Sequence, residues 1–153
     1  MTINWILKKF DQLSTHELYA IMQLRNEVFV VEQDCIYQDA DNKDQASYHY
    51  MGWINGQDGN LRLVAYTRLL PPGLAHAEPS IGRVVTSPFV RGNGTGRVLM
   101  ERSLTEVLNL FGDQPVRIGA QVYLVEFYTS LGFRQSGDPY DEDGIEHIEM
   151  VKS

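Results

Sequence analysis

The sequence has almost no cysteine and no long apolar run, and each absence narrows the class of protein that it encodes. A single cysteine among 153 residues, Cys35, excludes an internal disulfide and favours a reducing, cytoplasmic location. No segment approaches the ~20 apolar residues of a membrane-spanning helix, so we expect no membrane partner. Residues 1–10 lack the ordered charged, apolar and small-residue regions of a signal peptide.

Basic residues are also scarce. Lysine and arginine number 13 against 20 aspartates and glutamates, for a formal net charge of -7. Such a chain repels a phosphate backbone, and we expect no nucleic-acid partner. Hydrophobic residues make up 43% and charged residues 22% of the chain, a composition typical of globular proteins. The length predicts one domain, spanning 1–153.

Hydrophobic periodicity predicts the elements of the N-terminal half. Residues 3–9 indicate a short strand, and a capping-box pattern opens a helix predicted over 15–30. Residues 33–47 are polar and predict a loop. Two segments rich in aromatic and aliphatic residues, 47–54 and 61–70, flank the sequence NGQDGN and predict an antiparallel hairpin.

The C-terminal half alternates strands and helices. We predict, in order, a strand at 81–86, a helix at 95–111, a strand at 115–122, a helix at 124–131, and strands near 133–137 and 146–151 that flank a turn at 141–144. The unit from 81 to 122 implies a right-handed parallel crossover inside a mixed sheet. The sequence therefore predicts an α/β layer architecture around one central sheet.

Three glycines and two arginines lie between the strand at 81–86 and the next helix, in the sequence RGNGTGR at 91–97. A helix N-terminus has unpaired N–H groups and about half a positive charge, and glycines let the backbone approach an anion closely. These features favour a phosphate-binding turn, although a plain connection with solvated arginines has the same spacing. The pattern is not a P-loop or a dinucleotide fingerprint, because Thr95 and Arg97 stand where those motifs need other residues.

The pattern R-x-x-G-x-G at 91–96 resembles the acetyl-CoA-binding motif of the GCN5-related N-acetyltransferase (GNAT) superfamily. A second segment, FYTSLGF at 127–133, is similar to the FYxxxGF segment of that family and follows the next predicted strand, as it does there. RNEVFVVEQ at 25–33 and DGIEHI at 143–148 resemble the ElaA-type branch. The first of these two segments is also similar to acyl-homoserine-lactone synthases, which share the fold.

The resemblance implies the GNAT fold, with a single mixed, mostly antiparallel sheet (an α+β arrangement), helices on both faces, and a splay between the strands at 81–86 and 116–121. It also implies that the turn holds the diphosphate of coenzyme A and that the preceding strand pairs with the pantetheine arm. The residues assigned to the cofactor in this way are Val84, Val85, Thr86, Arg91, Gly92, Asn93, Gly94, Thr95, Gly96, Arg97 and Phe127. Many members have asparagine near Gln121, so a cofactor contact of Gln121 stays open.

Acyl transfer from a thioester needs a neutral amine, a stabilised oxyanion and a protonated leaving thiolate. Tyr128 matches the general acid of the family, and a tyrosine that packs a helix on the sheet is the structural alternative. His147 lies on a predicted terminal strand, and a free histidine pKa of ~6.5 suits a base, although a structural histidine is equally consistent. Glu32 follows the first helix and could act as base, bind the acceptor amine or be solvated.

The acceptor site is expected beside the same helix. We assign Arg25, Glu32 and Gln33 to it, with Arg25 either binding an acceptor carboxylate or pairing with Glu32. No metal is expected. The aspartates of the 33–47 loop fail the spacing of a calcium-binding EF-hand, which predicts a solvated loop. We interpret Cys35 as a buried structural cysteine.

The sequence thus predicts an acetyl-CoA-dependent N-acetyltransferase that transfers an acetyl group directly, in a ternary complex, to a primary amine of a small-molecule or protein acceptor. Two alternatives remain, an enzyme similar to acyl-homoserine-lactone synthases and a non-catalytic module that binds coenzyme A. A homodimer is a further expectation from the superfamily.

Overall fold

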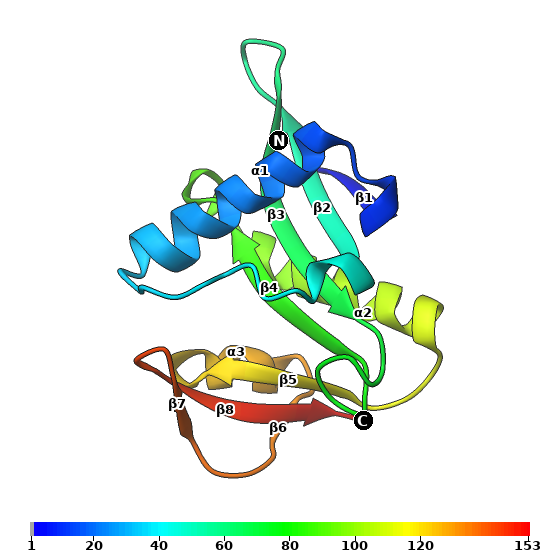
Figure 1. Cartoon of the computed structure of the whole chain (residues 1–153), viewed down its shortest axis with the longest axis vertical. Helices are drawn as coiled ribbons and strands as arrows, with labels where there is room; N and C mark the ends of the chain where they lie inside the picture. Colours follow the sequence, from blue (N-terminus) through cyan, green and yellow to red (C-terminus); the bar gives the residue numbers. More distant parts are fainter. Residues whose placement is uncertain (1) are drawn as a thin grey trace.

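The computed structural model describes residues 2–153, which form two antiparallel sheets that meet along one side (Figure 1). The first sheet has the order β1 (Asn4–Lys9), β2 (Tyr48–Asn55), β3 (Leu61–Leu70) and β4 (Ser80–Thr86). The second has the order β5 (Val116–Gln121), β8 (Ile145–Lys152) and β6 (Arg134–Gln135), and β7 (Tyr140–Glu142) also pairs with β8. All of these pairings are antiparallel.

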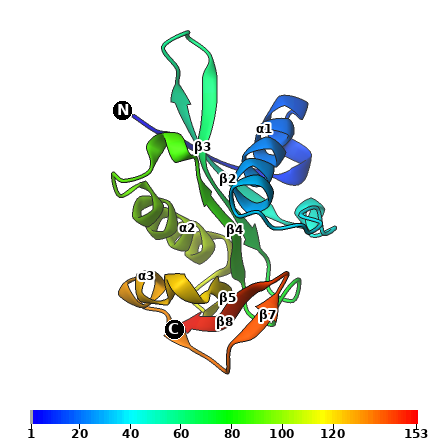
Figure 2. The same ribbon diagram turned by 90° about the vertical axis from the view of Figure 1, so that its left-hand side faces the viewer.

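Helices cover both faces, as expected. Figure 2 shows α1 (Thr15–Arg25) on one face of the first sheet and α2 (Thr95–Phe111) on the other, with α3 (Val125–Ser130) on the same side as α2 but against the second sheet. The predicted helix at 95–111 and the hairpin of β2 and β3 are confirmed. The strand predicted near 133–137 contains only two residues, Arg134–Gln135. The strand β7 was not predicted, because its three residues are too few to establish a hydrophobic periodicity.

The expected splay lies between β4 and β5, and it divides the hydrogen bonding of the central sheet in two. Within residues 2–153, one backbone hydrogen bond connects the two segments. The Arg117 N–H of β5 donates at 3.1 Å to the carbonyl of Pro79, which directly precedes β4. The cause lies in β4. Arg83 and Val84 together face the single residue Thr67 of β3, and Arg83 takes a left-handed φ of 50°. Such a bulge bends the strand away from the line of the sheet.

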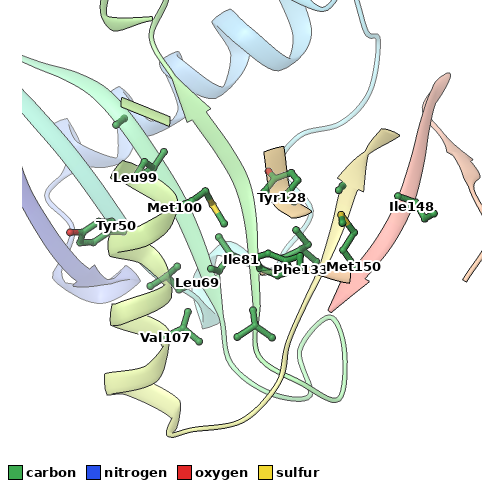
Figure 3. Close-up of a cluster of buried hydrophobic side chains, with 14 residues drawn as sticks. Tyr50, Leu69, Ile81, Leu99, Met100, Val107, Tyr128, Phe133, Ile148 and Met150 are labelled. Atoms are coloured by element: carbon green, nitrogen blue, oxygen red, sulfur yellow. The ribbon is translucent and has the colours of Figure 1, made fainter. Parts of the chain in front are cut away.

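One apolar core nevertheless joins the two sheets (Figure 3). Leu99 and Met100 of α2 are fully buried against Leu69 of the first sheet, and the same cluster contains Ile118 and Met150 of the second. Burying such side chains contributes roughly 1.5–3 kcal/mol each, which exceeds the net value of a typical hydrogen bond. The sheets therefore stay together without a continuous ladder.

The first helix differs from its prediction. The capping box is confirmed, because the Glu17 N–H donates to the Ser14 Oγ at 3.0 Å and the Ser14 N–H donates to Glu17 Oε1 at 2.8 Å. The α-helix ends at Arg25, however, and continues as a π-helix, η2 (Asn26–Glu32), so the prediction of a helix over 15–30 is wrong in type and end point. Wide turns of this kind are rare and often occur at functional sites.

Within residues 2–153, no helix has both the length and the apolar character needed to cross a bilayer.

Close packing around Gly52 generates a prediction about stability. A Cβ at this position in β2 would lie 2.8 Å from Trp5 Cζ3 and 3.1 Å from Ala65 Cβ, whereas a Cβ at Gly82 in β4 would meet only Leu70 Cδ1 at 3.6 Å. We expect Gly52→Ala to lower the free energy of unfolding by about 1–3 kcal/mol, because overpacking displaces its neighbours. Gly82→Ala, the matched control, should be neutral or stabilising by up to ~1 kcal/mol. Urea denaturation measures both, and equal values would contradict the packing argument.

Candidate active site

A cavity of about 890 Å³ lies between the splayed strands. Its walls come from β4 and from β5 and β8 of the second sheet, and the segment 28–43 lies across it. Five of the residues expected at the site line it from different elements: Glu32, Gln33, Arg91, Tyr128 and His147. The residues Val84, Val85 and Thr86 of β4 also line it.

The glycine-rich turn has the geometry of an anion cradle. Gly92 and Gly94 have φ of 87° and 80°, which residues with a side chain rarely adopt, and α2 begins directly afterwards. Gly94 is the N-cap and offers no side chain to the first N–H groups of α2. A Cβ built at Gly92, Gly94 or Gly96 would meet no atom within 4 Å. The space above these backbone amides is therefore open, and the residues present fit a diphosphate at the positive end of a 17-residue helix.

The two arginines at the turn have protein partners. Arg91 Nη1 donates to Glu32 Oε2 at 2.7 Å, and Arg91 Nη2 donates to the Thr86 carbonyl at 3.1 Å. The hydrogen bond from Arg91 holds the pKa of Glu32 below its usual value, which weakens Glu32 as a base. Arg97 contacts Ser130 Oγ and lies 6.0 Å from the ring of Phe127. Arg97 and Phe127 thus pack together beside the turn.

Tyr128 lies between β4 and β5 (Figure 3). Its ring packs edge-on against Phe127 and Phe133, with centroids 5.2 Å and 5.9 Å away. The residue is 6% exposed, and its hydroxyl makes no hydrogen bond to any residue between 2 and 153. Burial raises the pKa of Tyr128 to about 12, with a further contribution from Tyr123. The cavity therefore contains a phenol that remains protonated at any physiological pH.

His147 has one ring nitrogen directed to the backbone and one to a carboxylate. Its Nδ1 lies 2.8 Å from the Ile145 carbonyl, which can only accept, so Nδ1 carries a proton and donates it. In the neutral ring Nε2 is then the proton acceptor. Nε2 lies 3.6 Å from Glu142 Oε2, and the ring stacks on Tyr140 at 5.9 Å. Sequence reasoning missed Glu142, because its approach to His147 depends on the pairing of β7 with β8.

Arg25 does not reach the cavity. Its side chain is fully buried, with Nε donating to Asp39 Oδ2 and Nη1 donating to Asp44 Oδ1, both at 2.7 Å. The expected contact with an acceptor, or with Glu32, is therefore corrected to a structural role. The chain that follows α1 folds back over the helix, and this places the carboxylates of Asp39 and Asp44 beside the Arg25 guanidinium.

The predicted solvated loop is also wrong. Asp39, Asp41 and Asp44 pair with three arginines, since Arg68 donates to Asp41 and Asp44 at 2.8 Å and 3.0 Å and Arg83 donates to Asp39 at 2.8 Å. Burial alone would raise the pKa of Asp44, but hydrogen bonds and charge from Arg25 and Arg68 hold this pKa below its usual value. The ion pairs fix the segment 33–47 to β3 and β4.

Two contacts link that segment to the second sheet. Gln121 Nε2 donates to Gln33 Oε1 at 3.3 Å, and Cys35 Sγ donates to the Asp143 carbonyl at 3.2 Å. Cys35 is buried, as expected. Among residues 2–153, no group of three or more histidine, cysteine, aspartate or glutamate side chains is arranged to hold a metal ion.

Comparisons with known proteins agree with this geometry. A family model described as an acetyltransferase (GNAT) domain matches residues 20–153. A crystal structure of an acyl-CoA N-acyltransferase from Pseudomonas aeruginosa is 42% identical with a TM-score of 0.91, over 99% of this chain and all of that one. Escherichia coli ElaA is 41% identical over 98% of this chain and 96% of its own length, and a crystal structure of ElaA has a TM-score of 0.89. A UPF0039 protein of Synechocystis is 44% identical over 99% of this chain and 96% of its own length.

The buried ion pairs of Arg25 predict a large and pH-dependent effect on stability. Arg25→Met removes one of the two arginine partners of each of Asp39 and Asp44, leaving only Arg83 on Asp39 and Arg68 on Asp44, and should lower the free energy of unfolding by up to about 3–5 kcal/mol at neutral pH. Because the folded pKa of Asp44 is lowered, its contribution is present above the unfolded pKa of ~3.9 and is lost as the pH falls through the folded value.

The difference in unfolding free energy between wild type and Arg25→Met should therefore become smaller as the pH falls below ~4. Chemical denaturation across this range measures it. Arg134→Met, which replaces an exposed arginine without an ion pair among the described residues, should change the unfolding free energy by less than ~0.5 kcal/mol. A pH-independent difference for Arg25→Met would contradict the electrostatic origin.

Proposed function

Because the chain belongs to the GNAT acetyltransferase family, we propose that it is an acetyl-CoA-dependent N-acetyltransferase that acts on a primary amine by direct transfer in a ternary complex. The observation that carries this proposal is an unpaired strand edge and a buried phenol that line one cavity, together with an open anion cradle that begins at Arg91, the residue of the turn that lines the same cavity. The cradle is the turn at 91–96, the edge belongs to β4, and the phenol is Tyr128. Acyl transfer from coenzyme A is the chemistry that uses all three.

Backbone amides of the turn bind the diphosphate in this proposal, and the charge at the start of α2 adds to the attraction. The exposed ion pair of Arg91 with Glu32 is worth no more than ~1 kcal/mol, so a dianionic diphosphate can displace Glu32 and take the guanidinium. A Bacillus subtilis acetyltransferase that was solved in complex with CoA has a TM-score of 0.67 at 15% identity, which supports the likeness of fold.

The edge of β4 receives the extended arm. Residues Val84, Val85 and Thr86 line the cavity, and the splay leaves their strand without a neighbour on the β5 side. An arm that carries amide groups can pair with such an edge as an added strand would. Phe127 and Arg97 pack beside the turn and would flank the arm.

When bound, acetyl-CoA supplies a thioester whose carbonyl carbon accepts the amine. His147 Nε2 accepts the proton of the amine, directly or through water, and Glu142 stabilises the resulting imidazolium from 3.6 Å. Backbone N–H groups near Val85 donate to the developing oxyanion. Glu32 is the weaker base while Arg91 holds it, because the same contact lowers its pKa.

Tyr128 assists the departing sulfur. A phenol with a pKa of about 12 is a poor acid toward a thiolate of pKa ~8.5, and complete proton transfer is uphill by about 5 kcal/mol. Tyr128 therefore acts chiefly as a hydrogen-bond donor to the thiolate, with the final proton coming from solvent. Its lack of a protein partner leaves this donor available.

A carboxylate introduced at Gly96 tests the cofactor site. A Cβ there meets no protein atom within 4 Å, so Gly96→Glu should fold normally while placing a negative charge where the diphosphate is proposed to bind. We expect the Kd for coenzyme A, measured by titration calorimetry, to rise by at least about tenfold. Leu108→Glu adds the same charge to an exposed position late in α2 and should leave the Kd unchanged. Wild-type affinity in Gly96→Glu would place the diphosphate elsewhere.

Replacing the buried phenol tests the catalytic assignment. Tyr128→Phe removes only the hydroxyl and should lower kcat about 10- to 100-fold, with little change in KM for acetyl-CoA. The assay is thiol release from acetyl-CoA with a library of amines. Tyr123→Phe, at an exposed tyrosine that also lines the cavity, is the matched control and should retain activity.

Unchanged turnover in Tyr128→Phe would remove Tyr128 from the mechanism. Tight binding of coenzyme A without transfer to any amine would instead favour a non-catalytic module.

A further inference from the structure

The cavity continues past the splayed strands to the end of the β3–β4 hairpin, where Lys43, Arg68 and Arg83 line it together with one carboxylate, Asp41. We propose that this end is a carboxylate-binding subsite formed by Arg83 and Lys43, and that the acetyl acceptor is a small amine that also bears a carboxylate, of the α-amino acid class. The proposal rests on the acetyltransferase function given above and specifies its substrate.

Arg83 offers donors that its protein partners do not use. Its Nε donates to Asp39 Oδ1 at 2.8 Å, and its Nη2 donates to the Asp39 carbonyl at 2.9 Å and to Asp41 Oδ2 at 3.4 Å. Its Nη1 has no partner within residues 2–153, and the side chain is 22% exposed where it lines the cavity. The ring of Tyr37 lies 5.7 Å from the guanidinium and restricts its orientation. An oriented guanidinium with free N–H groups suits a planar carboxylate.

Two neighbours favour an anion at the same place. Arg68 lines the cavity with a side chain that is 4% exposed, and its Nε is the one buried side-chain nitrogen or oxygen in the described chain without a hydrogen-bond partner. Lys43 also lines the cavity and has no ion pair among residues 2–153. Because Arg25, Arg68 and Arg83 are balanced by Asp39, Asp41 and Asp44, Lys43 makes this end of the cavity net positive.

The position of Arg83 fits an acceptor whose amine and carboxylate are close together. Arg83 precedes Val84, where the thioester arm is proposed to pair, and adjacent Cα atoms are about 3.8 Å apart. A carboxylate bound by Arg83 is therefore held by the residue that directly precedes the proposed start of the arm on β4. Glu142 and His147 line the same cavity, and His147 Nε2 is the proposed acceptor of the amine proton. The cavity thus offers both cations for the carboxylate and a base for the amine of one small acceptor.

Matched acids and amides test the proposal. The L-α-amino acids with a primary amine, the carboxamide of each, spermidine, and a lysine peptide blocked at both ends are incubated with acetyl-CoA and the full-length protein. Thiol release and the mass of the product report acetylation. We expect at least one amino acid to be acetylated with a kcat/KM about tenfold or more above that of its amide, because the amide lacks the charge that Arg83 and Lys43 bind.

The variant Lys43→Gln tests carboxylate binding independently of the acetyl-transfer step. The Lys43 side chain makes no hydrogen bond or ion pair with residues 2–153, so the variant should fold. It should raise KM for the amino acid about tenfold, with kcat and the KM of the amide little changed. Arg134→Gln, which removes an exposed cation outside the cavity, should leave the acid-to-amide ratio as in wild type.

The outcomes distinguish failure of the carboxylate subsite from failure of the proposed acetyltransferase function. Acetylation of amides, spermidine or the blocked peptide as efficiently as the acids overturns the subsite and leaves the acetyltransferase function standing. If no amine is acetylated, the proposed function fails, and calorimetry of the same acid and amide pairs on the protein saturated with coenzyme A decides the subsite. Tighter binding of acids than amides, lost in Lys43→Gln, supports it, and equal or absent binding overturns it.

Discussion

The bulge at Arg83 is the feature on which the site depends. A left-handed backbone at a residue with a long side chain is strained, and an ion pair with the Asp39 carboxylate and a hydrogen bond to the Asp39 carbonyl offset that strain. Because Arg83 and Val84 share one partner on β3, the strand leaves the line of the sheet just before the residues that line the cavity. The unpaired edge, the cavity and the position of the proposed carboxylate subsite all follow from this local distortion.

A split sheet loses ladder hydrogen bonds, and two other interactions replace them. The apolar cluster under α2 and α3 contains residues of both sheets, so water is excluded from the base of the splay. Above the splay, the segment 33–47 is fixed to the first sheet by buried ion pairs and touches the second through Gln33 and Cys35. The cavity is thus held open by a core on one side and a polar network on the other.

The proposed chemistry depends on how the environment tunes each group. Burial raises the pKa of Tyr128 and keeps it a donor, while Arg91 lowers the pKa of Glu32 and weakens it as a base. His147 presents Nε2 as an acceptor because its Nδ1 proton is engaged by a backbone carbonyl. In the proposed mechanism the amine is deprotonated by His147 of β8 and the leaving thiolate is stabilised by Tyr128 of α3, so the two groups do not compete for one proton.

Local features of the molecule could be predicted from the sequence by itself, because adjacent residues carry their signals. The capping box, the helix over 95–111, the hairpin and the glycine-rich turn at the start of that helix all depend on spacing within a few residues. Burial of Arg25, pairing of the three aspartates and the approach of Glu142 to His147 depend on segments 14 to 44 residues apart or on a three-residue strand. Only the tertiary structure decided these contacts, since the partner of a charged side chain is set by where the chain returns and not by its own neighbours.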